Sequence, residues 1–316
     1  MERAQKIRDI CGRFRILVIG RANAGKTTIL KVVCDSTEDP EIFNSQGRKI
    51  KSTVLTPSEK RGQHNIENEM VFRSNPGFIF HDSLGFEAGD TDELKKVEAF
   101  IAQRSEQTKL QDQVHAIWYC IPMDDTRPFT KAEESFFSDC GTGRVPVIAI
   151  FTKFDAQDHK AYRALRNEEV PIENAGHQAA LRAEQECQPV LNRIYESRYG
   201  PKSHVYLRDM HKPKAQCDEL MEKTASTLND EVLKLLFVST QRNNLKLCIE
   251  HALTRDIMRE IVRFGKTQTL DKHASNVGSH GMKKDDIFRV HCGVMLWFPH
   301  IVVNDSEHNP CGMTIS

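Results

Sequence analysis

A short loop between an apolar strand and a helix constrains this chain more than any other feature of its sequence. Residues 20–27 read Gly-Arg-Ala-Asn-Ala-Gly-Lys-Thr and fit the pattern G-x-x-x-x-G-K-[ST] without a gap. Residues 14–19 are largely apolar, which predicts a buried strand, and residues 27–33 predict a helix. This order predicts a phosphate-binding loop, delivered by the first strand of an α/β sheet.

Each part of this loop is expected to contact a different part of a phosphate chain or its metal ion. Backbone N–H groups point inward at phosphate oxygens, and the N-terminus of the following helix adds its dipole. Lys26 places a cation on the β- and γ-phosphates, while Thr27 offers its hydroxyl to Mg²⁺. The predicted nucleotide contacts of this loop are Gly20, Asn23, Ala24, Gly25, Lys26, Thr27 and Thr28.

A second motif, Asp-Ser-Leu-Gly at residues 82–85, follows a predicted strand at residues 77–80. After a phosphate-binding loop, this D-x-x-G pattern is the expected second element on the metal side. Asp82 would hold Mg²⁺ through water, and the N–H of Gly85 would contact the γ-phosphate. The pattern is common by itself, and the alternative is an ordinary Asp-Gly turn.

A third motif, Thr-Lys-Phe-Asp, follows the continuous apolar run at residues 147–151. The carboxylate of Asp155 can accept hydrogen bonds from both N1–H and the N2 amino group of guanine. Adenine lacks this pair of donors and would leave the carboxylate poorly paired. The aliphatic stem of Lys153 can lie along the base, and Thr152 stands where the pattern more often has Asn. The motif therefore predicts guanine recognition.

Two further contacts are expected from less specific segments. The apolar run at residues 233–238 predicts a last strand, so the backbone of Ser239 and Thr240 is expected to face the guanine carbonyl. A switch hydroxyl that closes onto Mg²⁺ is expected between residues 50 and 64.

Thr53, Thr56 and Ser58 could each supply this switch hydroxyl, and Thr56 is favoured. Arg61 and Gln63 follow them and would reach the γ-phosphate if the segment folds over it. Solvated loop residues are the more frequent alternative for both. The predicted catalytic set is Asn23, Lys26 and Thr56, and the predicted metal ligands are Thr27, Thr56 and Asp82.

Taken together, these motifs resemble a G-domain GTPase of the translation-factor-related class of P-loop proteins. Residues 81–87 (HDSLGFE) and 116–122 (AIWYCIP) are similar to a group of little-characterised fungal G-domain proteins. The resemblance covers about residues 13–262. It implies a P-loop sheet, GTP or GDP with Mg²⁺ as ligands, and a slow GTP-hydrolysing switch.

Two positions depart from, or add to, the pattern of familiar small GTPases. Phe86 stands where those proteins have a Gln that orients the attacking water, and a phenyl ring cannot do this. Asn23 lies in a Gly-Arg-x-Asn-x-Gly-Lys loop that resembles those of potassium-stimulated GTPases. The resemblance leads to the hypothesis that K⁺ near the phosphates supplies the missing charge.

Strands alternate with helices along the chain, which implies a mainly parallel sheet covered by helices on both faces. A helical insertion is expected at residues 156–230, before the last strand. Residues 35–63 are polar and predict a long loop. The expected organisation is an N-terminal segment 1–12, a G domain 13–262 and a partly irregular tail 263–316.

The remaining elements are predicted from shorter patterns of hydrophobicity. A turn at residues 74–77 is expected to join an edge strand to the strand of the second motif. The predicted strands are 64–72, 77–80, 114–121, 145–151 and 204–207, and the predicted helices are 91–101, 132–137, 178–199, 217–228 and 245–261.

Composition narrows the class of partner. The chain has 44 basic and 44 acidic side chains, which argues against nucleic acid and anionic membranes as partners. Nine cysteines occur without a C-x-x-C pair, so a reducing compartment, the cytoplasm, is expected. The first eleven residues lack the apolar core of a secretory signal, and no apolar run approaches about 18 residues. Protein effectors or regulators are the expected partners, and dimerisation across the nucleotide face stays open.

Three functions remain compatible with the sequence. The first is a GTP-binding switch with slow hydrolysis. The second is an interaction module that holds GTP or GDP without useful turnover, which Phe86 keeps open. The third is a P-loop kinase or ATPase, in which case the Thr-Lys-Phe-Asp motif arose by chance.

Overall fold

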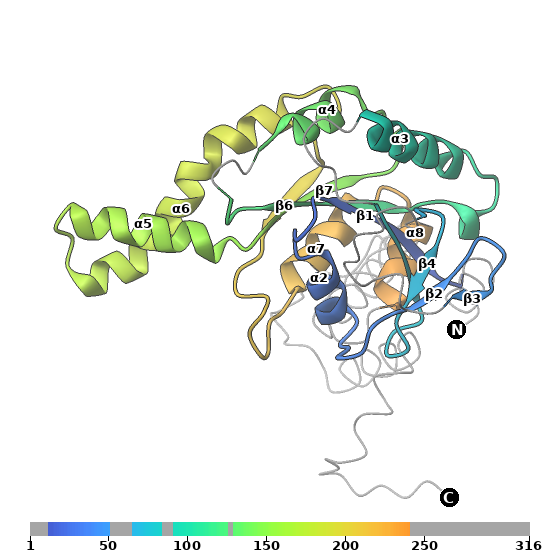
Figure 1. The fold of residues 1–316 in the computed structure, drawn as a ribbon, viewed down its shortest axis with the longest axis horizontal. Coiled ribbons are helices and arrows are strands. Elements are labelled where there is room, and N and C mark those ends of the chain that lie inside the picture. The colour runs from blue at the N-terminus through green and yellow to red at the C-terminus, as the bar shows by residue number, and fades with distance from the viewer. Residues whose placement is uncertain (1–11, 51–64, 84–90, 126–128, 241–316) are drawn as a thin grey trace, which may run out of the picture.

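One eight-stranded sheet forms the centre of the described part of the protein. A computed structural model describes residues 12–50, 65–83, 91–125 and 129–240 (Figure 1). The strand order is β3-β2-β4-β5-β1-β6-β7-β8. The strands are β1 Phe14–Gly20, β2 Glu41–Phe43, β3 Lys49–Ile50, β4 Glu69–Val71, β5 Phe78–Asp82, β6 Ala116–Pro122, β7 Val147–Thr152 and β8 Ser203–Tyr206.

The helices alternate with the strands along most of the chain, as the sequence predicted. They are α2 Lys26–Val33, α3 Thr91–Ser105, the 3₁₀ helix η2 Leu110–Asp112, α4 Lys131–Asp139, α5 Asp155–Asn167, α6 Ile172–Tyr195, α7 Asp218–Thr227 and α8 Glu231–Ser239. None of the helices in the described ranges has the length and apolar character needed to cross a membrane.

Five neighbouring strands, β5, β1, β6, β7 and β8, run parallel. The short strands β3, β2 and β4 pair in antiparallel fashion, and β4 joins β5 through the predicted hairpin. The sheet is therefore mainly parallel, which confirms the predicted α/β class. A parallel arrangement brings the carboxyl ends of β1, β5, β6, β7 and β8 to one edge of the sheet.

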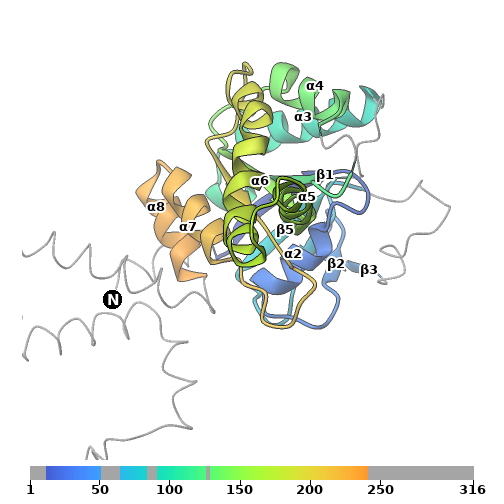
Figure 2. The same cartoon turned by 90° about the vertical axis from the view of Figure 1, so that its left-hand side faces the viewer.

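Helices cover both faces of the sheet, because the residues on both faces of its central strands are mainly apolar and buried. Phe14, Ile16 and Val18 of β1 belong to a core shared with α2, α7 and α8. Leu17 and Ile19 belong to a second core shared with α3, α4 and α6. Figure 2 shows α3 and α4 on one side of the sheet and α2, α7 and α8 on the other.

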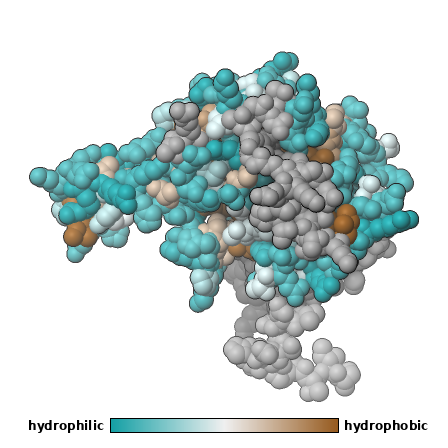
Figure 3. Space-filling view, in the orientation of Figure 1, coloured by the Kyte–Doolittle hydropathy of each residue, from teal (hydrophilic) through white to brown (hydrophobic). Residues whose placement is uncertain are grey.

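The hairpin of α5 and α6 extends beyond the sheet as an arm on the left of Figure 1. Its two helices pack on each other through Leu165, Ala175 and Ala179. The described residues on the face shown in Figure 3 are mainly hydrophilic. The exposed large apolar side chains include Ile172 and Leu181 of α6. The sequence predicted a helix at residues 178–199, which overlaps α6, but did not predict α5.

The predicted last strand at residues 233–238 is wrong, because this segment forms α8. Its start is capped by the Asp230 carboxylate, which accepts hydrogen bonds from the N–H groups of Val232 at 2.7 Å and Leu233 at 3.1 Å. Residues 235–238 are all buried, and the ring of Phe237 lies 4.8 Å from that of Phe14. A short, fully buried helix has the same continuous apolar run as a buried strand. The last strand among the described residues is β8.

The predicted long loop at residues 35–63 is also partly wrong, because β2 and β3 lie within it. Glu41 of β2 pairs with Val71 of β4 in the register of the sheet, and its carboxylate binds Lys49 and Arg73. As a result β4 lies between β2 and β5 instead of at the edge. Strands of two or three residues leave too little alternation to be read from sequence.

Several predicted segments cannot be compared with the structure. The helix at residues 245–261 and the tail 263–316 lie outside the described residues, as do the first eleven residues. The division of the chain into segment, domain and tail stays a prediction.

Candidate functional site

The predicted phosphate loop connects the end of β1 to the start of α2. Gly20 has φ +149°, and a Cβ atom there would lie 2.5 Å from the carbonyl oxygen of Cys120 on β6. Asn23 and Gly25 adopt left-handed conformations, with φ of 61° and 79°. Only glycine fits position 20, since any side chain would collide with the neighbouring strand.

Lys26, the first residue of α2, lies across this loop. Its Nζ donates to the carbonyl oxygen of Gly20 at 2.8 Å and of Arg21 at 3.3 Å. The same Nζ lies 3.6 Å from Oδ1 of Asp82 at the end of β5. β1 and β5 are parallel neighbours in which Val18 pairs with Asp82, so the strand register brings the lysine and the carboxylate together.

The other predicted residues of the loop differ in exposure. Ala24 is buried, whereas Asn23, Thr27 and Thr28 are exposed at the carboxyl edge of the sheet. The hydroxyl of Thr27 therefore stands on the first turn of α2, one residue after Lys26. An exposed hydroxyl, an ammonium group and a carboxylate on one edge can together bind a phosphate chain and a hard cation.

The Thr-Lys-Phe-Asp motif lies on the same edge, between the end of β7 and the start of α5. Oδ1 of Asp155 accepts a hydrogen bond from the backbone N–H of Asp209 at 3.0 Å. Lys153 has a left-handed φ of 53°, and its Nζ donates to Asp124 at 2.8 Å. Thr152 is buried, and its Oγ1 has no hydrogen-bond partner among the described residues. The backbone at Lys153 thus orients this motif within a tight turn.

Sequence reasoning missed the segment that follows β8. The N–H of Phe154 donates to the carbonyl oxygen of Leu207 at 2.9 Å, and Asp209 holds Asp155 as described above. Arg208 donates to Asp158 and Glu184 at 2.8 Å each, and its guanidinium lies over the ring of Phe154. The strand at 204–207 was predicted, but it was not taken as the parallel neighbour of β7. Pairing with β7 would place the carboxyl end of this strand, and the segment that follows it, beside Asp155.

The prediction that Ser239 and Thr240 face the guanine base is wrong. Asn75 donates from Nδ2 to the carbonyl oxygen of Thr240 at 3.1 Å. A Cβ atom on Gly77 would lie 3.1 Å from the Thr240 side chain. Both contacts precede β5, so Thr240 lies at the amino edge of the parallel strands, opposite Gly20. The error follows from taking α8 as a strand.

Several predicted residues lie outside the described part of the chain. They include the candidate switch hydroxyls and the residues of the D-x-x-G motif beyond Ser83: Thr53, Thr56, Ser58, Arg61, Gln63, Gly85 and Phe86.

His81 precedes Asp82 on β5 and is buried on the opposite face of the strand. Its Nε2 accepts a hydrogen bond from Arg15 at 2.7 Å. Because a carbonyl oxygen only accepts, Nδ1 carries the proton and donates to Ile66 at 2.8 Å. Burial, and after it the nearby Arg15 cation, lower the pKa of His81 to about 3. The ring is hydrogen-bonded at both nitrogens and supports the end of β5.

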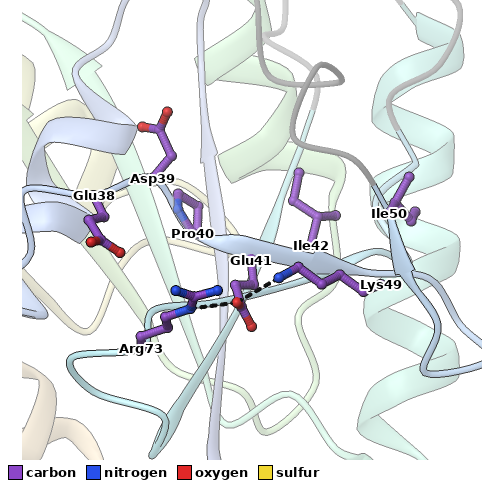
Figure 4. Close-up of a pocket in the computed structure, with 8 residues that line it drawn as sticks. All are labelled: Glu38, Asp39, Pro40, Glu41, Ile42, Lys49, Ile50 and Arg73. Atoms are coloured by element: carbon purple, nitrogen blue, oxygen red, sulfur yellow. Dashed lines mark hydrogen bonds and ion pairs between the residues drawn. The ribbon is translucent and has the colours of Figure 1, made fainter.

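A pocket of about 500 Å³ lies away from these loops, at the outer end of the sheet around β2 and β3. Figure 4 shows that its central carboxylate, Glu41, accepts hydrogen bonds from Lys49 and Arg73. Both cations of this pocket are therefore paired with one of its own carboxylates. The pocket adds no residue to the candidate site.

Comparisons with known proteins leave the family open. Neither the family models nor the curated proteins include a match to this chain. Among solved structures, the chain is similar to the G domain of the T. maritima FeoB iron transporter, with 12% identity and a TM-score of 0.32. That alignment covers 68% of this chain and 98% of the other. It is also similar to a mutation variant of SsGBP, with 15% identity and a TM-score of 0.33, over 69% of this chain and 58% of the other. Because both TM-scores are low, neither similarity assigns a role to a residue of this chain.

Proposed function

We propose that this protein binds GTP and GDP with Mg²⁺ and acts as a slow GTP-hydrolysing switch. The observation that carries the proposal is the placement of two loops on one edge of a parallel sheet. The glycine loop follows β1 and the Thr-Lys-Phe-Asp loop follows β7, with β6 between them. Ligands of open α/β sheets bind at the carboxyl ends of the strands, where such loops meet.

The phosphate half of the site rests on the loop backbone and on Lys26. The loop approaches the sheet closely enough to require glycine at position 20. Its N–H groups and the N-terminus of α2 offer partial positive charge, and Lys26 adds a full charge. These groups neutralise a triphosphate locally, so the zero net charge of the chain does not oppose a polyanionic ligand.

The oxygen atoms near Lys26 suit Mg²⁺. Thr27 offers a hydroxyl and Asp82 a carboxylate, and hard oxygen ligands are what Mg²⁺ prefers. Asp82 would hold the ion through water, and Thr56 is proposed as the switch ligand. When bound, the ion neutralises charge on the β- and γ-phosphate oxygens.

The base half of the site rests on Asp155. The N–H of Asp209 fixes one oxygen of this carboxylate, which orients it at the N-terminus of α5. An oriented carboxylate pairs with the two adjacent donors of guanine and not with adenine. We propose that the backbone of residues 207–211, in place of Ser239 and Thr240, faces the guanine carbonyl.

The decisive experiment is to identify the nucleotide that remains bound to the purified protein. We expect GDP or GTP by chromatography of the denatured sample, and its loss in Lys26→Ala. Lys31→Ala is the matched control, because Lys31 lies on the same helix but pairs with Asp39 on the surface. Tight binding of ATP in competition with GTP would instead favour the kinase or ATPase reading.

Turnover is a separate question from binding. Phe86 favours the second candidate, a module that holds nucleotide without useful hydrolysis. A single-turnover assay with and without candidate protein partners separates the two.

If K⁺ assists through Asn23, hydrolysis is faster in KCl than in NaCl, and equal rates would refute this role. A cytoplasmic location is proposed on the sequence alone.

A further inference from the structure

The segment between β6 and α4 contacts both halves of the candidate site through acidic side chains. Asp124 accepts from Lys153 of the base loop at 2.8 Å, and the next residue, Asp125, accepts from Arg21 of the phosphate loop at 3.1 Å. The end of β6 is also joined to β7, because the N–H of Met123 donates to the carbonyl oxygen of Thr152 at 2.9 Å. Two adjacent carboxylates thus bind one cation from each loop.

A buried carboxylate strengthens the phosphate side of this arrangement. Oε1 of Glu133 lies 3.1 Å from Nε of Arg21, and the Glu133 side chain is fully buried. Oε2 of Glu133 accepts from the backbone N–H of Thr130 at 2.7 Å and forms part of a capping box at the start of α4. The helix cap therefore fixes the carboxylate that holds Arg21.

These contacts direct the Arg21 guanidinium toward α4. The Arg21 side chain is 13% exposed between Glu133 and Asp125. Its backbone carbonyl accepts from Lys26, so the position of Arg21 also affects the phosphate-binding lysine. Buried ion pairs with additional hydrogen bonds fix geometry more strongly than exposed pairs do.

We propose that Glu133, Asp125 and Asp124 are positioning residues that hold the phosphate loop and the base loop in register for guanine nucleotide. This inference rests on the proposed function and assigns residues that neither motif contains. Glu133 and Asp125 act on the phosphate loop through Arg21. Asp124 acts on the base loop through Lys153. The contacts of Arg21 therefore affect the phosphate end of the ligand, and the contact of Lys153 affects its base.

The test measures dissociation of fluorescent GDP and of the matching IDP, which lacks the N2 amino group, from the full chain. Glu133→Gln keeps an acceptor for Thr130 but removes the charge from Arg21. We expect it to speed release of GDP and IDP equally, by about tenfold. Asp124→Asn should speed GDP release by about threefold and reduce the preference for GDP over IDP.

Two further variants make the outcome decisive. Glu186→Gln is the control, because it removes a charge of the same kind from an exposed pair with Arg182 on the distant arm. Asp125→Asn tests the contact with Arg21 at a side chain that is 48% exposed. If the wild-type chain binds GDP and all three site variants release it like the control, the positioning role is refuted. If the wild-type chain binds no guanine nucleotide, the proposed function fails, and the positioning role fails with it.

Discussion

The two edges of the parallel strands differ in what their residues do. At the carboxyl edge, Gly20, Lys153 and Asp209 adopt positive φ, and charged side chains gather around Lys26 and Asp155. At the amino edge, aromatic side chains pack together and the polar groups bind one another. The difference fits the proposal that the carboxyl edge binds a ligand, while the contacts at the amino edge stabilise the fold.

The amino edge shows this second role in detail. The ring of Phe237 on α8 lies 4.8 Å from Phe14 and 5.9 Å from Phe78. The N–H of Phe14 donates to the carbonyl oxygen of Gly77 at 2.8 Å, and Asn75 closes the end of α8 through Thr240. The comparison therefore predicts that substitutions at the amino edge lower stability and that those at the carboxyl edge lower nucleotide binding.

The largest effect is expected from Phe237→Ala. Removing a fully buried ring from the aromatic cluster should lower the free energy of unfolding by about 3–5 kcal/mol. Urea unfolding measures this, and the folded fraction should bind GDP as the wild type does. Val232→Ala is the control, because Val232 lies on the same helix but is 39% exposed. A large loss of GDP affinity in folded Phe237→Ala would contradict the division between the edges.

Lowering the pH should reduce stability by nearly as much as Phe237→Ala does. The effect involves one buried histidine near each edge, His81 and His115. Burial lowers the pKa of His81 to about 3 and that of His115 to about 4. The unfolded chain takes up these protons below about pH 6.5, whereas the folded chain does not. Stability should therefore fall as pH falls from about 6.5 to 4, by about 1.4 kcal/mol per pH unit for each histidine.

The measurement for this prediction is urea unfolding at pH 7 and pH 5. The variant His81→Gln should reduce the difference between the two values, since glutamine does not titrate. If the variant and the wild type lose the same stability, His81 is not the neutral residue that its partners indicate.

A smaller effect, on binding alone, is expected from Asp155→Ala. Loss of the carboxylate that is proposed to pair with guanine should weaken GDP binding by about 2 kcal/mol, or about 30-fold, without changing IDP binding as much. Isothermal titration measures both affinities. Asp139→Ala, at the exposed end of α4, is the matched control. Equal losses for GDP and IDP would show that Asp155 does not contact the N2 amino group.

The smallest effect is expected from Asn75→Ala at the amino edge. Asn75 is buried, and its loss would leave the Thr240 carbonyl oxygen without this donor. We expect the free energy of unfolding to fall by about 1–2 kcal/mol, with GDP affinity unchanged. Thermal unfolding at fixed nucleotide concentration measures it. A change in affinity without a change in stability would reverse the roles assigned to the two edges.

Motifs at strand ends were predictable from the sequence, because their signals are local. The apolar runs of β1, β6 and β7 and the glycine loop were all found, and the register of parallel strands then brings Asp82 beside Lys26. The α8 segment was not predictable in the same way. A run of Leu, Phe and Val fits a buried strand and a buried helix equally well.

The residues that hold the loops in place were missed for a different reason. Arg21 binds Glu133, which is 112 positions away in the sequence, and Asp155 is held by Asp209. Neither pair has a spacing that indicates contact. Only the packing of α4 and β8 against their neighbours brings them together.

The sequence by itself determined the residues of the local motifs: a glycine loop and a lysine that are proposed to bind phosphate, and a carboxylate that is proposed to pair with guanine. These depend on residue types at short spacing, which the chain order fixes directly. The tertiary structure decided which of the described strands is last, which loop stands beside Asp155 and which edge Thr240 occupies. These three features depend on long-range pairing and burial. A helix and a strand of the same hydrophobicity can fill the same place in the core, so the hydrophobic pattern does not decide between them.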